Sequence, residues 1–200
     1  MKAKHCKVCK TPFTPSFSTT QVVCSPKCAF EHGRKETTKQ QRDIKRQQDE
    51  NKKAQKRKDR QWKEENKSRG QLNKEAQTAF NAFVRCRDYR QCCISCGRQL
   101  ETGLGGKTDC GHYRSVGSCP ELRFNLFNAH AQCVYCNRDM SGNIVEYRKG
   151  LLRRIGKDRL EWLESDHELK KYSHDDLRRI AKLFRKRKKC YERLRDRKDN

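Results

Sequence analysis

The sequence predicts a mixed α+β protein whose fold is stabilised partly by bound zinc and partly by a hydrophobic core. Eight of the thirteen cysteines fall in closely spaced pairs, as zinc ligands do. Apolar residues at helical spacing lie on both sides of a glycine-rich central stretch that is typical of short strands. Charged residues make up 37% of the 200 residues and hydrophobic residues only 32%, too few apolar groups for one large core.

The charge balance points to a polyanionic partner. There are 49 Lys and Arg against 25 Asp and Glu, a net charge of +24, and such a chain gains affinity for phosphates by releasing their counterions. Nucleic acid is the expected partner. A membrane is not, because we find no long apolar run, signal-peptide core or lipidation motif. Paired cysteines in an odd total indicate a reducing cytoplasm.

Residues 1–33 are predicted to form a zinc-ribbon-like module. The segment has almost no apolar core, so four unrelated free thiols would leave it unfolded, whereas a tetrahedral zinc site would fold it. His5 and His32 could substitute for a ligand. The expected ligands are one pair with two residues between its cysteines and, after a gap of fourteen residues, a pair with three residues between them: Cys6, Cys9, Cys24 and Cys28.

Residues 34–70 form a basic arm or linker. This range holds fifteen Lys and Arg against seven Asp and Glu, and its only apolar residues are Ile44, Ala54 and Trp62. The composition favours a solvated helix that contacts phosphates, but a merely solubilising linker fits equally well. No heptad of apolar residues is present, so we do not expect a coiled coil here.

Residues 71–156 should contain the globular core. Apolar residues at helical spacing predict a leading helix over 71–88, and glycines and turn residues between 92 and 126 predict short strands around a hairpin. A further helix is expected over 143–155, with Gly156 as its end.

Residues 157–200 are predicted to be helical and basic. A short helix is expected over 158–170, and a longer one after Ser173, where Asp176 would complete a capping box. Residues 178–198 hold twelve Lys and Arg against two acidic residues, so this helix is a second expected nucleic-acid contact. The densest run is Arg185, Lys186, Arg187, Lys188 and Lys189.

A second zinc site is expected inside the core. Two cysteine pairs, each with two residues between its cysteines and with 36 residues between the pairs, would fill all four zinc positions and make the ion structural. We regard the other cysteines as ordinary thiols, with Cys92 or Cys110 as replacements should one ligand be misassigned. The expected ligands are Cys93, Cys96, Cys133 and Cys136; the other cysteines, besides those two, are Cys86, Cys119 and Cys190.

The stretch from Asp109 to Asn137 resembles the HNH, or His-Me finger, nuclease motif. It contains DCGHY, then Asn128 five residues before Cys133, then Asn137 directly after Cys136. The wider series CISCG, GHYRS, LRFN, QCVYCN, SGN and YR, with a cysteine-rich head and basic arms, resembles the NinG family of lambdoid phages, recombination endonucleases also called Rap. The resemblance covers essentially the whole chain and is most specific from residue 93 to 148.

The resemblance implies a ββα-metal core that cleaves branched DNA, such as Holliday junctions and D-loops, during phage recombination in the bacterial cytoplasm. It implies His112 as general base, in keeping with the pKa of imidazole, and Asn128 as the residue that orients it. Asp109 and Asn137 would be oxygen ligands of a catalytic Mg²⁺ or Mn²⁺. Gly111 stands where many HNH members carry an acidic ligand. Four arginines could bind the scissile phosphate or simply be surface charge: Arg114, Arg123, Arg138 and Arg148.

Two alternatives remain open at this point. The charge and the paired cysteines fit a non-catalytic zinc protein that binds nucleic acid as an accessory factor equally well. A general HNH nicking endonuclease would also carry His112 and Asn128. A homodimer would suit the two symmetric cuts that resolve a junction, and a phage or host recombinase is a plausible partner.

Overall fold

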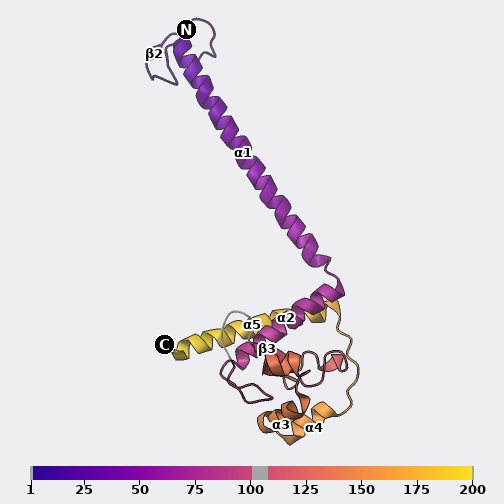
Figure 1. Ribbon diagram of the computed structural model, residues 1–200. Coiled ribbons are helices and arrows are strands. Elements are labelled where there is room, and N and C mark those ends of the chain that lie inside the picture. The colour runs from indigo at the N-terminus through magenta and orange to yellow at the C-terminus, as the bar shows by residue number, and fades with distance from the viewer. Residues whose placement is uncertain (1, 101–107, 200) are drawn as a thin grey trace. The chain divides into compact units, whose positions relative to one another are not determined.

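The chain divides between Asn66 and Lys67 into two compact units, which are described separately (Figure 1). The computed structural model describes residues 2–100 and 108–199. The architecture is α+β, as predicted, with long helices and two small antiparallel sheets of two strands each. No helix in the described ranges is long and apolar enough to cross a membrane.

The first unit is a small cysteine-rich hairpin followed by one long helix. β1 (Lys4–His5) pairs with β2 (Pro12–Phe13), and α1 runs over Pro26–Glu65. The Ser25 hydroxyl caps α1 by accepting a hydrogen bond from the N–H of Cys28, and Pro26 suits the first turn because no partner for its missing N–H is needed there. α1 thus begins inside the range 1–33 predicted for the cysteine module.

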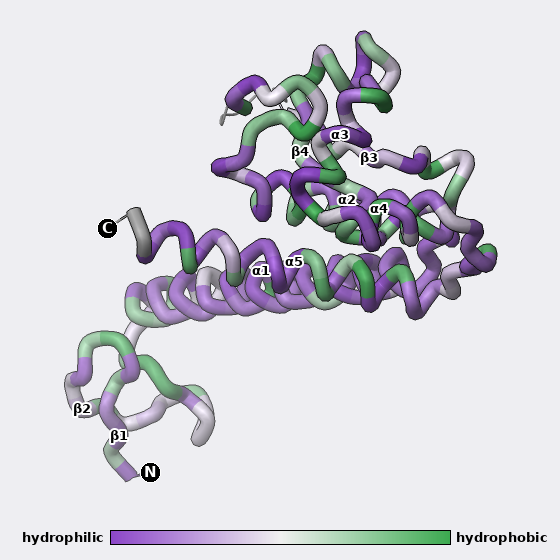
Figure 2. The backbone as a smooth tube through the Cα atoms, turned by 90° about the horizontal axis from the view of Figure 1, so that it is seen from below, coloured by the Kyte–Doolittle hydropathy of each residue, from purple (hydrophilic) through white to green (hydrophobic). Residues whose placement is uncertain are grey.

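No residue of α1 is buried within its unit. Figure 2 shows its course as hydrophilic almost throughout. The sequence prediction of a solvated helix is confirmed, and the helix extends further toward the N-terminus than expected. Its sequence is rich in Lys, Arg, Gln and Glu, which lose little side-chain freedom in a helix.

The second unit is built on two packed helices, α2 (Arg69–Arg87) and α5 (His174–Asp199). A capping box, in which Ser68 and Gln71 bond each other's backbone N–H, starts α2. The rings of Phe80 and Phe184 meet edge to face at 4.9 Å between centroids. The apolar residues whose spacing predicted both helices form the faces that α2 and α5 bury against each other.

The sheet of the second unit lies against α2. β3 (Thr108–His112) pairs antiparallel with β4 (Ala129–Cys133), with Thr108 opposite Cys133 and His112 opposite Ala129. Side chains alternate along a strand. Cys110 and His112 therefore face α2, where Cys110 packs on its apolar cluster, and Asp109 and Gly111 face the other way. The connection contains the 3-10 turn η1 (Pro120–Leu122).

On the far face of the sheet lie η2 (Tyr135–Asp139) and α3 (Ile144–Ile155), and α4 (Lys157–Glu164) packs against α3. The predicted end of α3 at Gly156 is confirmed, with φ of 83° at that glycine. α4 stops at Glu164, six residues before the expected end. The predicted cap of α5 is also confirmed, because Ser173 and Asp176 bond each other's backbone N–H at 3.0 and 3.1 Å.

Candidate functional site

The four cysteines of the core come together as predicted. Their Sγ atoms all lie within 4.8 Å of one another. Cys93 and Cys96 come from the turn after α2, Cys133 ends β4 and Cys136 lies in η2. Backbone N–H groups point at two of the sulfurs, Cys133 N to Cys93 Sγ at 3.4 Å and Cys136 N to Cys133 Sγ at 3.5 Å. Four thiolates at this spacing could hold a closed, structural zinc ion.

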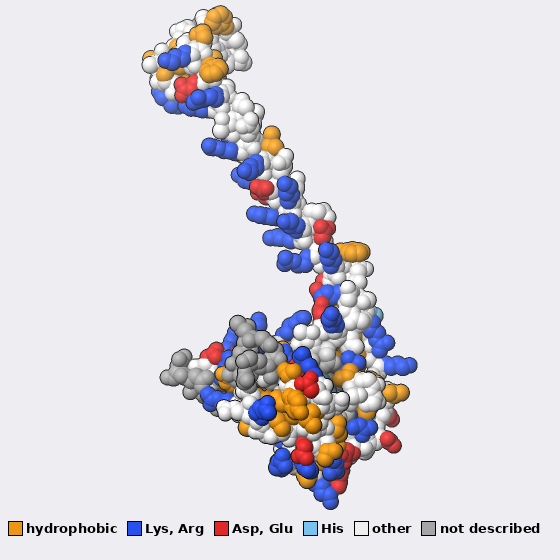
Figure 3. Space-filling model, viewed as in Figure 1, with side chains coloured by type: hydrophobic (Ala, Val, Ile, Leu, Met, Phe, Trp, Pro, Cys, Tyr) orange, Lys and Arg blue, Asp and Glu red, His pale blue; other side chains and the backbone are white. Residues whose placement is uncertain are grey.

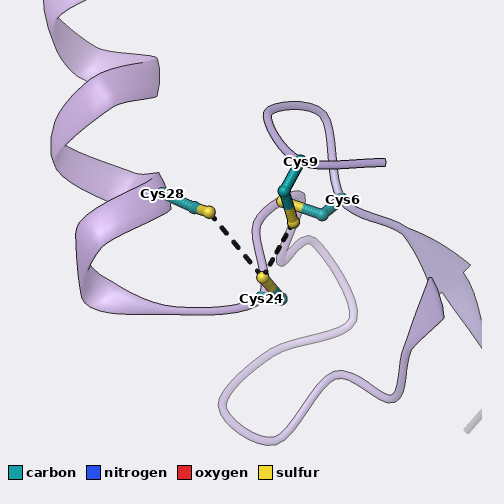
Figure 4. A group of neighbouring side chains, drawn as sticks. All are labelled: Cys6, Cys9, Cys24 and Cys28. Carbon is teal, nitrogen blue, oxygen red and sulfur yellow. Dashed lines mark hydrogen bonds between the residues drawn. The ribbon is translucent and has the colours of Figure 1, made fainter. Parts of the chain in front are cut away.

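The N-terminal tetrad is also assembled (Figure 4). Cys9 Sγ lies 3.4 Å from Cys24 Sγ, which lies 3.8 Å from Cys28 Sγ. Cys6 is buried and completes the group. Because Cys28 belongs to the first turn of α1, a zinc ion here would join the hairpin to the helix.

His112 sits at the end of β3 in a largely buried position. Its Nε2 is 3.0 Å from the carbonyl oxygen of Arg123, and its ring lies 5.7 Å from that of Phe80 in α2. Burial lowers the pKa of His112 below its usual range, although the carbonyls of Arg123 and Cys110 oppose this. The imidazole is therefore neutral at neutral pH and fixed in orientation.

Asn128 is fully buried and holds the chain that follows His112. Its Oδ1 accepts from Arg114 N at 2.8 Å, and its Nδ2 donates to the carbonyls of Arg114 at 3.0 Å and Leu122 at 3.3 Å. Its own carbonyl accepts from Tyr113 N at 2.8 Å. One side chain thus fixes both ends of the connection between β3 and η1.

Asp109 and Asn137 lie together, but not at His112. Asn137 Nδ2 donates to Asp109 Oδ2 at 2.9 Å, while Arg138 donates to both carboxylate oxygens at 2.7 and 2.9 Å. Asp109 and His112 are three positions apart on β3, which is about 10 Å along the strand, and their side chains leave opposite faces of it. Asp109, with Asn137 beside it, therefore lies on the face of β3 opposite to His112. The role of these two residues as ligands of a catalytic Mg²⁺ or Mn²⁺ stays a prediction.

Gly111, directly before the histidine, offers no side-chain ligand for a cation. A Cβ at Gly111 would lie 2.1 Å from Gln132 Oε1, so the Gln132 amide fills the space that a side chain at 111 would need. Gln132 Nε2 donates to Ser95 Oγ at 2.8 Å and to the carbonyl of Gly142 at 2.6 Å, and its Oε1 is buried without a partner. A neutral amide packs here in place of an acidic ligand.

The four arginines near the motif all have protein partners. Arg114 donates to Cys119 Sγ and to the carbonyls that end α4, so it joins the loop after β3 to α4; contact with a phosphate stays a prediction. Arg123 donates to Gln77 at 3.3 Å. The side chains of Arg138 and Arg148 pair with Asp109 and Glu164, yet remain 61% and 51% exposed.

The basic run of α5 is placed at the surface. Arg185 to Arg187 and Lys189 are exposed and Lys188 is half-buried. Arg185 lies 3.6 Å from Glu75 of α2, Lys188 pairs with Glu192, and the guanidinium of Arg187 lies over Phe184. Most of the run is therefore exposed, and its contact with nucleic acid stays a prediction.

The structure also contains a buried charge cluster that sequence reasoning missed. Arg87 donates to both oxygens of Asp88 at 2.7 and 2.9 Å, and to the carbonyls of Leu126 and Ala129. His130 lies beside both residues. Burial alone would raise the pKa of Asp88, but hydrogen bonds from Arg87 and His130 hold it well below its usual range. An Arg-Asp pair at the end of an amphipathic helix was the only signal.

These features define a class of α+β protein with two cysteine tetrads, each of which could bind a zinc ion, and with a histidine at the end of a strand. Residues 1–194 match the family model described as bacteriophage lambda NinG protein, and the chain belongs to that family.

Curated relatives agree with this assignment. The chain is 38% identical to "Protein ninG" of Escherichia phage 933W over 190 residues, which cover 93% of this chain and 92% of that protein. It is 41% identical to "Protein ninG" of Escherichia phage lambda over 123 residues, which cover 62% of this chain and 58% of that protein. No solved structure matches the chain.

Proposed function

We propose that this NinG protein is an endonuclease that hydrolyses phosphodiesters at branched DNA, such as Holliday junctions and D-loops, during phage recombination in the host cell. The observation that carries the proposal is the fixed imidazole of His112, with Nε2 held 3.0 Å from the Arg123 carbonyl. The preference for branched DNA rests on the family resemblance.

The hydrogen bond of His112 selects its tautomer. A carbonyl oxygen only accepts, so the bond to Arg123 supports the neutral tautomer that carries its proton on Nε2 and has Nδ1 as the basic nitrogen. Phosphodiester hydrolysis needs a base that removes a proton from the attacking water. A neutral imidazole whose pKa is lowered by burial is ready for that role at pH 7.

Asn128 serves this chemistry as a positioning residue. Its bonds to the backbone of Arg114 and Leu122 fix the loop that carries the Arg123 carbonyl, and that carbonyl in turn holds His112. Arg123 also supplies a cation next to the histidine, which favours a phosphate there. No step is assigned to a divalent cation on Asp109 and Asn137, because Asp109 points away from His112 on the other face of β3 and pairs with Arg138.

Cleavage of a labelled four-way junction and of the matching linear duplex tests the proposal. The arms are wild type, His112→Ala and the matched control His174→Ala, which removes an exposed histidine of α5, each with Mg²⁺ and with EDTA. We expect junction cleavage by wild type and the control, and a loss of about 100-fold or more in His112→Ala. Equal cleavage by His112→Ala would refute the base assignment.

A non-catalytic DNA-binding accessory protein is the second candidate. It is favoured by the two positions at which the motif would carry cation ligands, since Arg138 pairs with Asp109 and the Gln132 amide fills the space beside Gly111. In the same assay, tight junction binding by all three proteins with no cleavage by any would select it. Equal cutting of junction and linear duplex would select a general nicking enzyme instead.

A further inference from the structure

We propose that α1 is a one-sided binding surface for the phosphates of duplex DNA. The proposal rests on DNA being the partner, as proposed above, but not on catalysis. Its basis is the distribution of charge around the helix, which composition alone does not reveal. We call the Lys and Arg residues of α1, with the exception of Lys58, the basic stripe.

The basic stripe occupies one sector of the helix. An α-helix turns about 100° per residue, so residues 35, 39, 42, 46, 53, 57 and 60 lie almost above one another. On this spacing, thirteen of the fourteen Lys and Arg of α1 fall within about 140° of the circumference. Figure 3 shows these basic side chains projecting mainly to one side of the helix.

The sector and the rest of the helix differ in the sign of their charge. The sector contains thirteen basic residues and only three acidic ones, Glu31, Asp49 and Glu64, which gives it a net charge of +10. The remaining surface holds Lys58 against five carboxylates, a net charge of −4. A solubilising linker would not need this separation, whereas a polyanion bound along one side would favour it.

The remaining surface supports the helix without a packing partner. Three pairs of side chains at i,i+4 are hydrogen-bonded there: Gln47 to Asn51 at 3.2 Å, and Gln55 to Asp59 and Gln61 to Glu65 at 2.8 Å. Such pairs each stabilise an isolated helix slightly. α1 can therefore stay helical while the basic stripe is free to bind a ligand.

The other polyanion, a lipid surface, fits this helix poorly. Membrane-surface helices carry a continuous apolar face opposite their basic residues. Here only Phe30, Ile44 and Trp62 are large, apolar and exposed, and the last two are 18 residues or about 27 Å apart. The same spacing is too sparse for a coiled-coil seam.

Duplex DNA fits the dimensions as well as the sign. Lys27 and Lys63 mark the ends of the basic stripe, 36 residues or about 54 Å apart. One turn of B-DNA spans about 34–36 Å, so the stripe can reach phosphates over more than one turn. Lys and Arg along a straight rod contact phosphates and not base edges, so binding should be independent of sequence.

Two full-length triple variants, each with a net charge lower by 3, test the proposal. The stripe variant is Lys39→Gln, Lys53→Gln and Lys56→Gln. The control variant, confined to the remaining surface, is Gln40→Glu, Asn51→Glu and Lys58→Gln. Affinity for a labelled linear duplex is measured by fluorescence anisotropy from low to high salt, circular dichroism reports the helix content of each variant, and a parallel assay measures junction cleavage by wild type.

We expect the stripe variant to lose about 2 to 3 units of slope in log K against log salt, since each phosphate contact contributes about 0.9. The control should keep the wild-type slope. Equal slopes in the two variants at equal helix content would overturn the proposal, as would a stripe-dependent affinity for phosphatidylglycerol vesicles that exceeds the affinity for DNA. Stripe-dependent binding with no cleavage by wild type would refute only the nuclease; cleavage with equal slopes would refute only this inference.

Discussion

The amide of Asn128 bonds both backbone polar groups of Arg114, accepting from its N–H at 2.8 Å and donating to its carbonyl at 3.0 Å. Asn128 is 0% exposed, so no water can replace either bond. Arg114 lies two residues after His112. The geometry of the histidine therefore depends on a side chain 16 positions away in the sequence.

Asn128→Ala should destabilise the second unit and disturb the histidine together. Loss of the amide leaves buried backbone groups unpaired, which costs about 3 kcal/mol of unfolding free energy. Urea unfolding at pH 7 measures this. Asn125→Ala is the control, because Asn125 Oδ1 only accepts from the N–H of Phe127 and Asn128 in an accessible turn, and should cost about 1 kcal/mol. Equal losses in the two variants would contradict the special role of Asn128.

The pH dependence of cleavage should reflect the lowered pKa of His112. A base acts in its neutral form, so the rate should rise with pH and level off once His112 is neutral. The midpoint of the rise should lie below about 6.5, the usual pKa of histidine. His112→Ala should lack this rise, whereas His174→Ala should keep it. A midpoint above 7 would show that another group is the base.

Each tetrad should bind one zinc ion independently of the other. Metal analysis of the purified protein should give two zinc ions per chain, and Cys6→Ser and Cys133→Ser should each give one. Only Cys133→Ser should unfold the second unit, because that tetrad joins β4 to the turn after α2. Cys190→Ser, which changes an exposed thiol outside both tetrads, should keep two; a loss of zinc there would contradict the ligand assignment.

Asp109→Asn should leave most of the cleavage activity intact. Its carboxylate pairs with the largely exposed Arg138, so the substitution costs about 1 kcal/mol of stability at most. The rate of junction cleavage should change by less than about tenfold, against about 100-fold for His112→Ala. A complete loss of cleavage in Asp109→Asn that excess Mn²⁺ reverses would show that Asp109 is a cation ligand.

Asp88→Asn should make stability less dependent on pH. The pKa of Asp88 is lower in the folded than in the unfolded chain, so its stabilisation is complete above about pH 4 and is lost as the pH falls further. At pH 7 the substitution should cost about 3 kcal/mol, because it breaks a buried ion pair. The difference from wild type should shrink at pH 3. Asp166→Asn, an exposed control, should show no difference at either pH.

Local signals predicted much of the fold. The helices α2, α3 and α5 follow from apolar periodicity together with Gly156 and the Ser173 cap, which act within one or two turns. The cysteine spacing predicted both tetrads for the same reason, since each pair makes its own turn. The start of α1 was missed, although Ser25 and Pro26 are a recognisable helix-start signal.

The surroundings of the candidate site depended on contacts that are distant in sequence. Register places His112 opposite Ala129 and sends Asp109 to the other face of β3. The motif alone does not predict which face of the sheet each residue takes. It gives the order of the residues, but not that β3 is unbroken from Thr108 to His112, which fixes the alternation of side chains. Likewise, the partners of Arg114 lie about 50 residues away, at the end of α4.

Gly150 shows that the cysteine site depends on a residue that is not one of its ligands. A Cβ at Gly150 would lie 1.9 Å from the carbonyl oxygen of Ile94, in the turn between Cys93 and Cys96. The backbone of α3 thus touches the backbone of the ligand turn directly. Any side chain at position 150 would push the two apart and distort the sulfur geometry while all four cysteines remained in place. Loss of zinc from a variant of this chain is therefore not proof that a ligand was changed.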